Sequence, residues 1–258
     1  MLPSATSSSS CRRTTSVADY TAIVSGGNTG IGAAIAQSLL AEDYDVISLS
    51  RRKPDWSHPK LSAYEVDLLD ATATRQIATE IAAKVAITHV VHNAGAIRAR
   101  LLDEVEDEDV GALAQLHFGA AIALAQAALP SMKRARFGRI VLLSSRAALG
   151  AVTRTVYSAT KAGIIGMART WALELAPFGI TVNVVAPGPI GDTEMFESVM
   201  SVESERARKL AQSIPLGRLG KSSDVARAVR FFSSPDADFI TGQTLYVCGG
   251  ASIGSISI

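Results

Sequence analysis

A glycine-rich turn separates a short apolar run from a longer amphipathic stretch near the start of the chain. The apolar run, 21–24, is typical of a buried strand, and residues 31–40 have the spacing of a helix. Four glycines lie between them: Gly26, Gly27, Gly30 and Gly32. Such a strand-to-helix turn lets backbone amides and a helix N-terminus approach a pyrophosphate. The pattern therefore predicts an α/β unit with an anion-binding turn, although an ordinary tight turn has the same composition.

The rest of the 258-residue chain continues this alternation. Strands are predicted over 20–25, 45–50, 61–67, 89–93, 139–144, 181–186 and 244–248, and helices over 30–41, 70–84, 104–132, 158–176 and 223–233. Helices of this length between short apolar strands favour right-handed βαβ units and a parallel sheet. One domain is expected over 18–258. Residues 1–17 are rich in Ser and Thr and contain no acid, which predicts a disordered tail, with a transit peptide as the alternative.

The carboxyl ends of the predicted strands carry polar or small residues. In a doubly wound parallel sheet the ligand crevice lies at these ends. The residues concerned are Ser25, Ser50, Asp67, Asn93, Ser145 and Pro187. We therefore expect the functional site at this edge of the sheet.

A tyrosine and a lysine, Tyr157 and Lys161, lie four residues apart after the pair Ser144 and Ser145. On a helix, residues at this spacing share one face, so the phenol and the ammonium group lie side by side. A phenol has a pKa of about 10, and a nearby cation lowers that pKa towards neutrality. With a serine hydroxyl beside it, the pair suits hydride transfer at a carbon that bears oxygen. A chance pair on a surface helix is the simpler alternative.

The glycine-rich turn and the Tyr-x-x-x-Lys segment together resemble those of the short-chain dehydrogenase/reductase family, in its compact single-domain branch. The resemblance covers about residues 18–250. Its segments are Ser25-Gly-Gly-Asn-Thr-Gly-Ile-Gly32, His92-Asn-Ala-Gly95, Gly138-Arg-Ile-Val-Leu-Leu-Ser-Ser145, Tyr157-x-x-x-Lys161, Ile180-Thr-Val-Asn-Val-Val-Ala-Pro-Gly188, Pro215-Leu-Gly-Arg-Leu-Gly220 and Phe239-Ile-Thr-Gly-Gln-Thr. It implies a Rossmann-like, doubly wound, seven-stranded parallel sheet flanked by helices, and an enzyme that interconverts a carbonyl and a secondary alcohol.

The end of the second predicted strand bears on the choice of cofactor. An acid here would bind the ribose diol of NAD and repel a 2′-phosphate. This chain has Ser50 instead, followed by Arg51, Arg52 and Lys53. A guanidinium group matches the geometry of a phosphate. The segment therefore predicts NADP(H) in preference to NAD(H), with a solvated basic loop as the alternative.

The resemblance also implies which residues hold the cofactor. Asp67 would touch the adenine ring, Asn93 and Gly95 would line the adenosine ribose, and Ile190 and Thr193 would bracket the nicotinamide amide. One residue more than usual separates Pro187 from Thr193. The full expected set is Ser25, Gly26, Asn28, Gly30, Ile31, Gly32, Ser50, Arg51, Arg52, Asp67, Leu68, Asn93, Ala94, Gly95, Tyr157, Lys161, Pro187, Gly188, Ile190 and Thr193.

The resemblance assigns catalytic roles as well. Tyr157 would exchange a proton with the substrate oxygen, Lys161 would bind the nicotinamide ribose and favour the phenolate, and Ser145 would hold the substrate oxygen. Ser144 is the competitor, since adjacent strand residues face opposite sides and only one of the two serines should reach the site. His117 stands where relatives often have an Asn that serves a water relay to the lysine. We expect His117 to serve that relay, with simple packing as the alternative.

The substrate is less constrained. Reduction of 3-oxoacyl groups on acyl carrier protein is a well-known activity of similar proteins, and Lys133, Arg134 and Arg136 could meet an acidic carrier. Leu173, before Glu174, stands where carrier-linked reductases often have a basic residue. A free small ketone or alcohol is therefore at least as good a candidate as a carrier-bound group.

Two further parts of the sequence bear on the substrate. Arginine pairs at 98 and 100, and at 146 and 154, could bind an acidic substrate. Residues 192–213, which we call the lid segment, are expected to form a helical lid with an apolar wall. An NADP-binding sensor or scaffold without turnover is the alternative function, but a pure binder has no chemical need for all three residues of the Ser-Tyr-Lys set.

The composition limits the partners. A net charge of +1 implies no attraction to nucleic acid, and no apolar run reaches the length needed to span a bilayer. Only two cysteines are present, Cys11 and Cys248, which argues against a disulfide framework and favours the cytoplasm. No metal site is predicted. Relatives are commonly tetramers, so a homotetramer or homodimer is expected.

Overall fold

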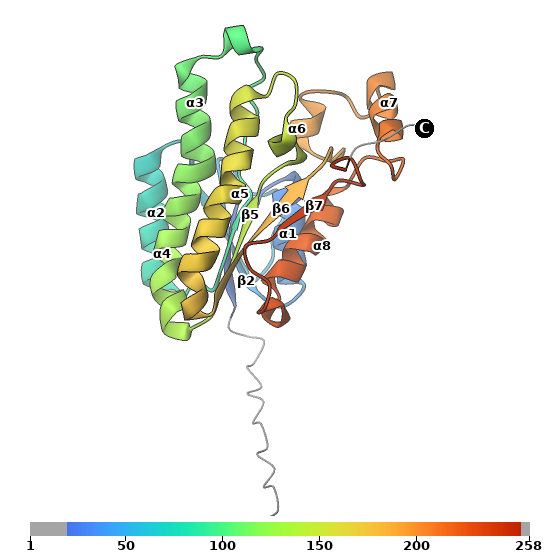
Figure 1. Cartoon of the computed structure of the whole chain (residues 1–258). Helices are drawn as coiled ribbons and strands as arrows, with labels where there is room; N and C mark the ends of the chain where they lie inside the picture. Colours follow the sequence, from blue (N-terminus) through green and yellow to red (C-terminus); the bar gives the residue numbers. More distant parts are fainter. Residues whose placement is uncertain (1–19, 254–258) are drawn as a thin grey trace, which may run out of the picture.

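The computed structural model describes residues 20–253, and the expectations for 1–17 lie outside them. Seven parallel strands form one sheet in the order β3-β2-β1-β4-β5-β6-β7 (Figure 1). The strands are β1 (Thr21–Ser25), β2 (Asp45–Ser50), β3 (Leu61–Glu65), β4 (His89–His92), β5 (Gly138–Leu143), β6 (Ile180–Pro187) and β7 (Thr244–Val247). Each expected strand is present, and the predicted fold class is confirmed.

Helices cover both faces of the sheet (Figure 1). One face carries α2 (Ala71–Lys84), α4 (Ala120–Ala135) and α5 (Thr155–Leu175), and the other carries α1 (Gly30–Leu40) and α8 (Ser222–Ser233). Three shorter helices lie towards the carboxyl edge: α3 (Asp107–Ala114), which leads into α4, and α6 (Glu194–Glu197) and α7 (Glu205–Ser213), which belong to the loop after β6. Single 3₁₀ turns lie at Leu102–Glu104, Arg146–Leu149, Ala176–Phe178 and Pro235–Ala237.

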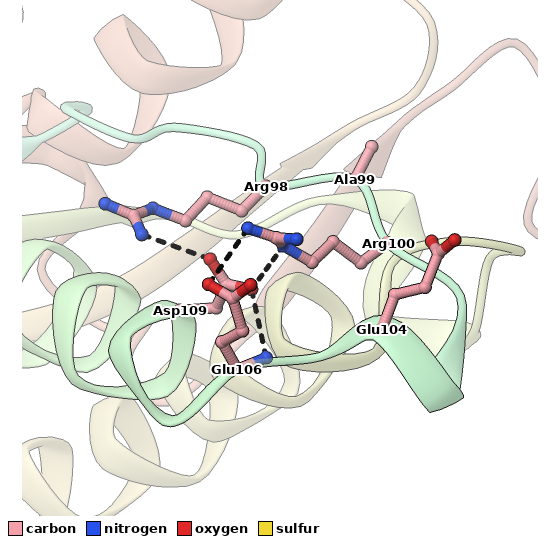
Figure 2. A pocket seen from close by; sticks show the side chains of 6 residues that line it. All are labelled: Arg98, Ala99, Arg100, Glu104, Glu106 and Asp109. Atoms are coloured by element: carbon pink, nitrogen blue, oxygen red, sulfur yellow. Dashed lines mark hydrogen bonds and ion pairs between the residues drawn. The ribbon is translucent and has the colours of Figure 1, made fainter.

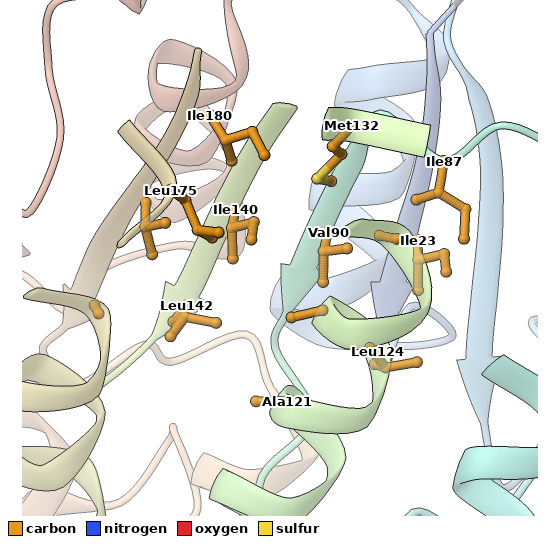
Figure 3. Packing of buried hydrophobic residues seen from close by; sticks show 14 of the residues in the cluster. Ile23, Ile87, Val90, Ala121, Leu124, Met132, Ile140, Leu142, Leu175 and Ile180 are labelled. Carbon is orange, nitrogen blue, oxygen red and sulfur yellow. The ribbon is translucent and has the colours of Figure 1, made fainter. Parts of the chain in front are cut away.

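The strands divide their side chains between two hydrophobic cores because successive residues point to opposite faces. In β5, Ile140 and Leu142 pack beneath α4 and α5, whereas Val141 and Leu143 face the α1 and α8 side. Figure 3 shows the first core, in which Leu124 and Met132 of α4 meet the sheet. This double burial explains why the central strands are almost uniformly apolar.

The long helix expected over 104–132 begins later and has a defect inside it. It starts at Asp107, because the Glu106 amide is capped by the carboxylate of Asp109 at 3.3 Å. A π turn at Gln115–Gly119 separates α3 from α4 and contains His117. The helix ends at Ala135, and its C-cap residue Arg136 has a φ of 51°. A change of backbone repeat of this kind cannot be read from hydrophobic spacing.

One apolar helical stretch, 107–135, is long enough to cross a bilayer by length and composition. Among the described residues, this stretch contradicts the expectation that no apolar run reaches the length needed to span a bilayer. Half of its most apolar window is buried within the fold. Ala121, Leu124 and Ala128 of this stretch belong to the core against the sheet, as expected for a core helix.

Candidate active site

The carboxyl ends of the strands bring the candidate residues to one edge of the sheet. β1 and β4 are neighbours in the sheet, but α1, which follows β1, and α4, which follows β4, cover opposite faces. The connections therefore diverge between these two strands and leave a crevice, which is the usual ligand position in such a sheet. The glycine-rich turn lies on one side of this crevice, and the segment after β4 lies on the other.

The glycine-rich turn has the conformation that the sequence predicts. Gly26 and Gly30 have φ values of 65° and 54°, in the region that favours glycine. Gly32 leaves no room for a side chain, because an added Cβ would collide with the Gly26 carbonyl. Thr29, the residue at the N-cap position of α1, makes no side-chain hydrogen bond to the helix N-terminus, and the first turn of α1 contains no acid. The positive end of the helix is thus uncompensated by side chains, as a pyrophosphate site requires.

Ser25 has a positioning role in this arrangement. Its side chain is fully buried, and its hydroxyl oxygen accepts from the amides of Asn93 and Ala94, both at 3.0 Å. Asn93 in turn donates to the carbonyls of Ser25 and Gly26, both at 3.2 Å. These bonds fix the end of β1 against the segment after β4, so the Ser25 side chain shapes the turn from beneath.

His92 completes the same network, although no role was predicted for it from the sequence. Its Nε2 lies 3.0 Å from the Leu116 carbonyl, so this nitrogen carries the proton, and Nδ1 accepts from Ser25 Oγ at 3.0 Å. Burial lowers the pKa of His92 to about 3, and the Lys161 charge adds to this effect. The histidine in place of the family's first Asn was the signal available in the sequence.

The end of β2 presents the basic residues to solvent. Ser50 is buried and donates to the Arg52 carbonyl at 3.1 Å, while Arg51 and Arg52 are exposed. Arg52 pairs with Glu194 at 2.8 Å. Beyond β3, Asp67 is exposed and accepts from the Leu69 amide at 3.0 Å. Its neighbour Leu68 is buried against Leu116 and Ala120.

The segment after β6 returns over the glycine turn. The Gly188 amide is bound to the Val247 carbonyl at 2.9 Å, and Ile190 is buried. Thr193 caps α6 by accepting from the Phe196 amide at 3.1 Å. A Cβ built on Gly30 would lie 3.2 Å from the Thr193 methyl group. Thr193 therefore lies against the turn despite the extra residue that precedes it.

The two candidate serines have different partners. Ser144 is buried and donates from Oγ to the Lys161 carbonyl at 2.7 Å, so its hydroxyl is engaged with the backbone of α5. Ser145 is half-buried and accepts from the Ala147 amide at 3.1 Å, which leaves its proton available. This geometry favours Ser145 as the serine that faces the site.

Tyr157 lies in the first turn of α5, because this helix starts at Thr155 and not at 158 as expected. Burial raises the pKa of Tyr157, whereas hydrogen bonding by Ser145 and the charge of Arg154 act in the opposite direction. The expectation that a nearby cation gives a net lowering of this pKa is therefore wrong for the isolated chain, in which desolvation is the larger effect.

Lys161 is buried beside Tyr157. Its Nζ donates to the Leu143 carbonyl at 2.8 Å and lies 5.6 Å from the centre of the Tyr157 ring. Burial lowers the pKa of Lys161 to about 7. The side-by-side placement expected from the i, i+4 spacing is confirmed, and the ammonium group can exchange a proton near neutral pH.

His117 is fully buried in the π turn, with its ring 5.7 Å from that of Tyr157. Its Nδ1 lies 2.8 Å from Thr160 Oγ1. Nε2 has no hydrogen-bond partner in the described part of the chain. An added Cβ on Gly95 would lie 3.2 Å from this nitrogen and 3.4 Å from Lys161 Nζ. His117 and Lys161 thus flank the same glycine. Burial and the Lys161 charge lower the pKa of His117 to about 2, so its ring is neutral.

Arg98 and Arg100 line an open polar hollow above the site, and Figure 2 shows both guanidinium groups directed at Asp109. The carboxylate of Asp109 is buried and lies 3.1 Å from Arg98 and 2.8 Å from Arg100. The Arg98 hydrogen bond is the main cause of a lowered pKa of Asp109. Both arginines are therefore engaged in holding this loop against a buried acid in the first turn of α3.

Comparison with known proteins agrees with this geometry. A family model described as enoyl-(acyl carrier protein) reductase matches residues 26–252. The 3-oxoacyl-[acyl-carrier-protein] reductase FabG of Escherichia coli is 35% identical over 237 residues, which are 89% of this chain and 96% of the relative.

Solved structures give the same result. The ligand-free aldohexose dehydrogenase of Thermoplasma acidophilum has a TM-score of 0.86 and 28% identity, covering 94% of this chain and 97% of its own. A blue fluorescent protein from a metagenomic library, in complex with NADPH, has a TM-score of 0.78 and 31% identity, covering 90% and 97%. With its glycine-rich turn, its Ser-Tyr-Lys set and these relatives, the chain belongs to the short-chain dehydrogenase/reductase family of oxidoreductases.

Proposed function

We propose that this protein is an NADP(H)-dependent oxidoreductase that interconverts a carbonyl and a secondary alcohol. The observation that supports this most strongly is the placement of Ser145, Tyr157 and Lys161 at the carboxyl edge of the sheet, beside an uncapped helix N-terminus. A protein that only binds a dinucleotide needs the helix N-terminus alone. The three side chains are the ones that carbonyl chemistry requires.

Tyr157 acts as the general acid in reduction and as the general base in oxidation. Ser145, whose hydroxyl accepts from the Ala147 amide and hydrogen-bonds Tyr157, would donate its proton to the substrate oxygen and orient it towards the phenol. The hydride would be supplied or accepted by NADP(H) when it is bound. Because its pKa is raised, Tyr157 gives up its proton only when another group stabilises the phenolate. Arg154 and Ser145 already favour the phenolate, and the Lys161 ammonium is the further candidate.

We assign His117 and Lys161 to the movement of the proton after it leaves Tyr157. The Thr160 hydroxyl has backbone carbonyls of Val156 and Tyr157 within 3.0 Å, so its own proton is used there. It then accepts from His117 Nδ1, which leaves His117 Nε2 as a bare acceptor beside Lys161. A neutral acceptor at this position can receive a hydrogen bond from the lysine or from a water molecule.

The residues present fit NADP(H). The glycine-rich turn and the N-terminus of α1 would hold the pyrophosphate through Gly26, Asn28, Gly30, Ile31 and Gly32. The remaining contacts expected above would come from the other strand ends. The adenosine side would meet Asp67, Leu68, Asn93, Ala94 and Gly95, and the 2′-phosphate would meet Ser50, Arg51 and Arg52. The nicotinamide side would meet Pro187, Gly188, Ile190, Thr193, Tyr157 and Lys161.

For the substrate, we propose a carbonyl compound with an apolar portion, with 3-oxoacyl thioesters as the first class to test. Met195, Val199 and Val202 of the lid segment are exposed and would give an apolar wall. Docking of an acidic carrier through Lys133, Arg134 and Arg136 is disfavoured. These residues end α4 just before β5 begins, at the edge of the sheet opposite Tyr157. Arg136 is also bound to the Pro177 carbonyl at 2.8 Å.

A titration and a rate assay test this proposal together. The wild type should bind NADPH more tightly than NADH and oxidise NADPH in the presence of a 3-oxoacyl thioester or a simple ketone. Tyr157→Phe should keep NADPH binding and lose turnover by at least about a hundredfold. Tight NADPH binding without turnover on any carbonyl compound would favour a sensor, and a preference for NADH would contradict the cofactor assignment.

We further propose a cytoplasmic homotetramer or homodimer. The edge strand β7 exposes Leu245, and the adjacent α8 exposes Phe231. Leu216, in the loop before α8, and Leu173, on α5, are also exposed. Exposed apolar groups at an open sheet edge are typical of subunit contacts. Light scattering coupled to size exclusion would give the mass, and a monomer at micromolar concentration would contradict this assembly.

A further inference from the structure

An ion pair joins two segments that serve different parts of the proposed site. The Arg52 guanidinium, just beyond β2, donates from Nη2 to both carboxylate oxygens of Glu194, at 3.0 and 2.8 Å. Glu194 is the first residue of α6, near the start of the lid segment. The contact therefore links the basic end of β2 to the start of the lid segment.

The residue before Glu194 extends this link to the glycine-rich turn. Thr193 caps α6 and lies with its methyl group against Gly30. Its hydroxyl also donates to the Ile190 carbonyl at 3.1 Å. A movement of Glu194 would therefore act on the neighbouring Thr193, whose side chain packs on the glycine-rich turn.

Among the basic residues that follow β2, Arg52 already pairs with a carboxylate, which it would have to release in order to bind a phosphate. In the described part of the chain, neither Arg51 nor Lys53 makes an ion pair. The Ser50 hydroxyl donates to the Arg52 carbonyl, which fixes the backbone from which the guanidinium extends. Both partners of the pair are about two-thirds exposed, at 66% and 64%, so the pair is weak and exchangeable.

We propose that the Glu194 carboxylate and the 2′-phosphate of NADP(H) are alternative partners of Arg52. Glu194 then sets how strongly the protein prefers the phosphorylated cofactor, and phosphate binding releases α6 from its contact with the end of β2. This inference rests on the proposed function. A guanidinium group binds either anion through the same planar donors, and a phosphate offers the greater charge. Because coupling is reciprocal, a contact that weakens phosphate binding is itself weakened by the phosphate.

Calorimetric titration with 2′,5′-ADP and 5′-AMP tests the exchange without any turnover. Glu194→Gln should tighten binding of 2′,5′-ADP by about two- to fivefold and leave 5′-AMP unchanged. Glu203→Gln removes the same charge elsewhere in the lid segment and should change neither affinity. Arg52→Gln should weaken 2′,5′-ADP binding, and adding Glu194→Gln in that background should have no further effect.

Hydrogen exchange at the α6 amides gives an independent readout. In the wild type, 2′,5′-ADP should speed exchange at 194–198, whereas 5′-AMP should not. An unchanged or weaker 2′,5′-ADP affinity in Glu194→Gln, or an equal gain in Glu203→Gln, would overturn the inference. If the wild type binds 2′,5′-ADP no better than 5′-AMP, the NADP(H) proposal fails with it. A clear preference without a Glu194 effect would overturn the exchange alone.

Discussion

The Nδ1 atom of His117 lies 2.8 Å from Thr160 Oγ1, three residues beyond Tyr157 on the same helix. This contact fixes which nitrogen of the imidazole is protonated, because the threonine proton is used by backbone carbonyls. The histidine therefore presents an acceptor, not a donor, beside Lys161. Thr160, which is not among the predicted site residues, thus determines which hydrogen bonds His117 can make in the site.

Replacing Thr160 by Val should impair turnover through His117. Without the hydroxyl, Nδ1 no longer has an acceptor, and the ring is free to turn its N–H towards the lysine. We expect turnover to fall by about ten- to hundredfold, with a shifted pH–rate profile and little change in NADPH affinity. Thr170→Val, on the exposed face of the same helix, is the matched control. An unchanged pH profile in both Thr160→Val and His117→Asn would remove the histidine from the relay.

The adjacent serines should separate chemistry from stability. Ser145→Ala should reduce turnover by about a hundredfold or more, since the substrate oxygen loses its donor. Ser144→Ala should keep most of the turnover and lower the free energy of unfolding by about 1 kcal/mol, because the Lys161 carbonyl loses its hydrogen bond. Steady-state rates and urea denaturation of both variants measure this. The opposite pattern would assign the catalytic role to Ser144.

Gly32→Ala should damage the turn that is proposed to hold the pyrophosphate. The new methyl group would meet the Gly26 carbonyl, so the turn must open. We expect a loss of about 1–3 kcal/mol in the free energy of unfolding and much weaker NADPH binding. Gly111→Ala is the control, because nothing lies within 4 Å of its added Cβ and helix propensity favours alanine. Equal NADPH affinity in both variants would contradict the assignment of the turn.

Acid should destabilise the protein through histidines that are buried as neutral rings. Burial lowers the pKa of His89 to about 3, and its ring packs against Tyr20 and Tyr44 with Nε2 bound to the Ser233 carbonyl at 3.0 Å. Below a pH of about 6.5 the unfolded chain takes up a proton that the folded chain does not. Stability therefore falls as the pH drops from about 6.5 towards 3, by about 2 kcal/mol per such histidine at a pH of about 5.

Urea denaturation at neutral and acidic pH measures this effect. His89→Gln should lose less stability than the wild type on going from a pH of about 7 to about 5. The exposed His58 provides the control substitution, His58→Gln, which should follow the wild type. A wild-type stability that is flat over this interval would show that the folded chain accommodates the charge.

The parallel sheet and the Ser-Tyr-Lys set were predictable because their signals are local. Buried central strands must be apolar, and the i, i+4 rule places Tyr157 beside Lys161 wherever a helix forms. The start of α5 was misplaced by three residues because it depends on Thr153, a β-branched residue with a φ of 63° that no propensity would predict.

The interactions that were missed depend on the tertiary structure. The buried Asp109 joins arginines about ten residues before it, and Glu194 meets Arg52 across 142 positions of the chain. The direction of the Tyr157 pKa shift was wrong for a related reason. Residue types show which charges are present, but not how much water the fold removes around them.

The cluster of Tyr20, Tyr44, His89 and Phe137 lies where strands begin, at the edge of the sheet opposite Tyr157. The chain enters the described fold at Tyr20 through this cluster. An affinity handle or a surface tether placed ahead of Tyr20 would thus anchor the protein by the end remote from the crevice. Immobilised in that way, the protein would keep the carboxyl edge of the sheet, with its crevice, turned towards the surrounding solution.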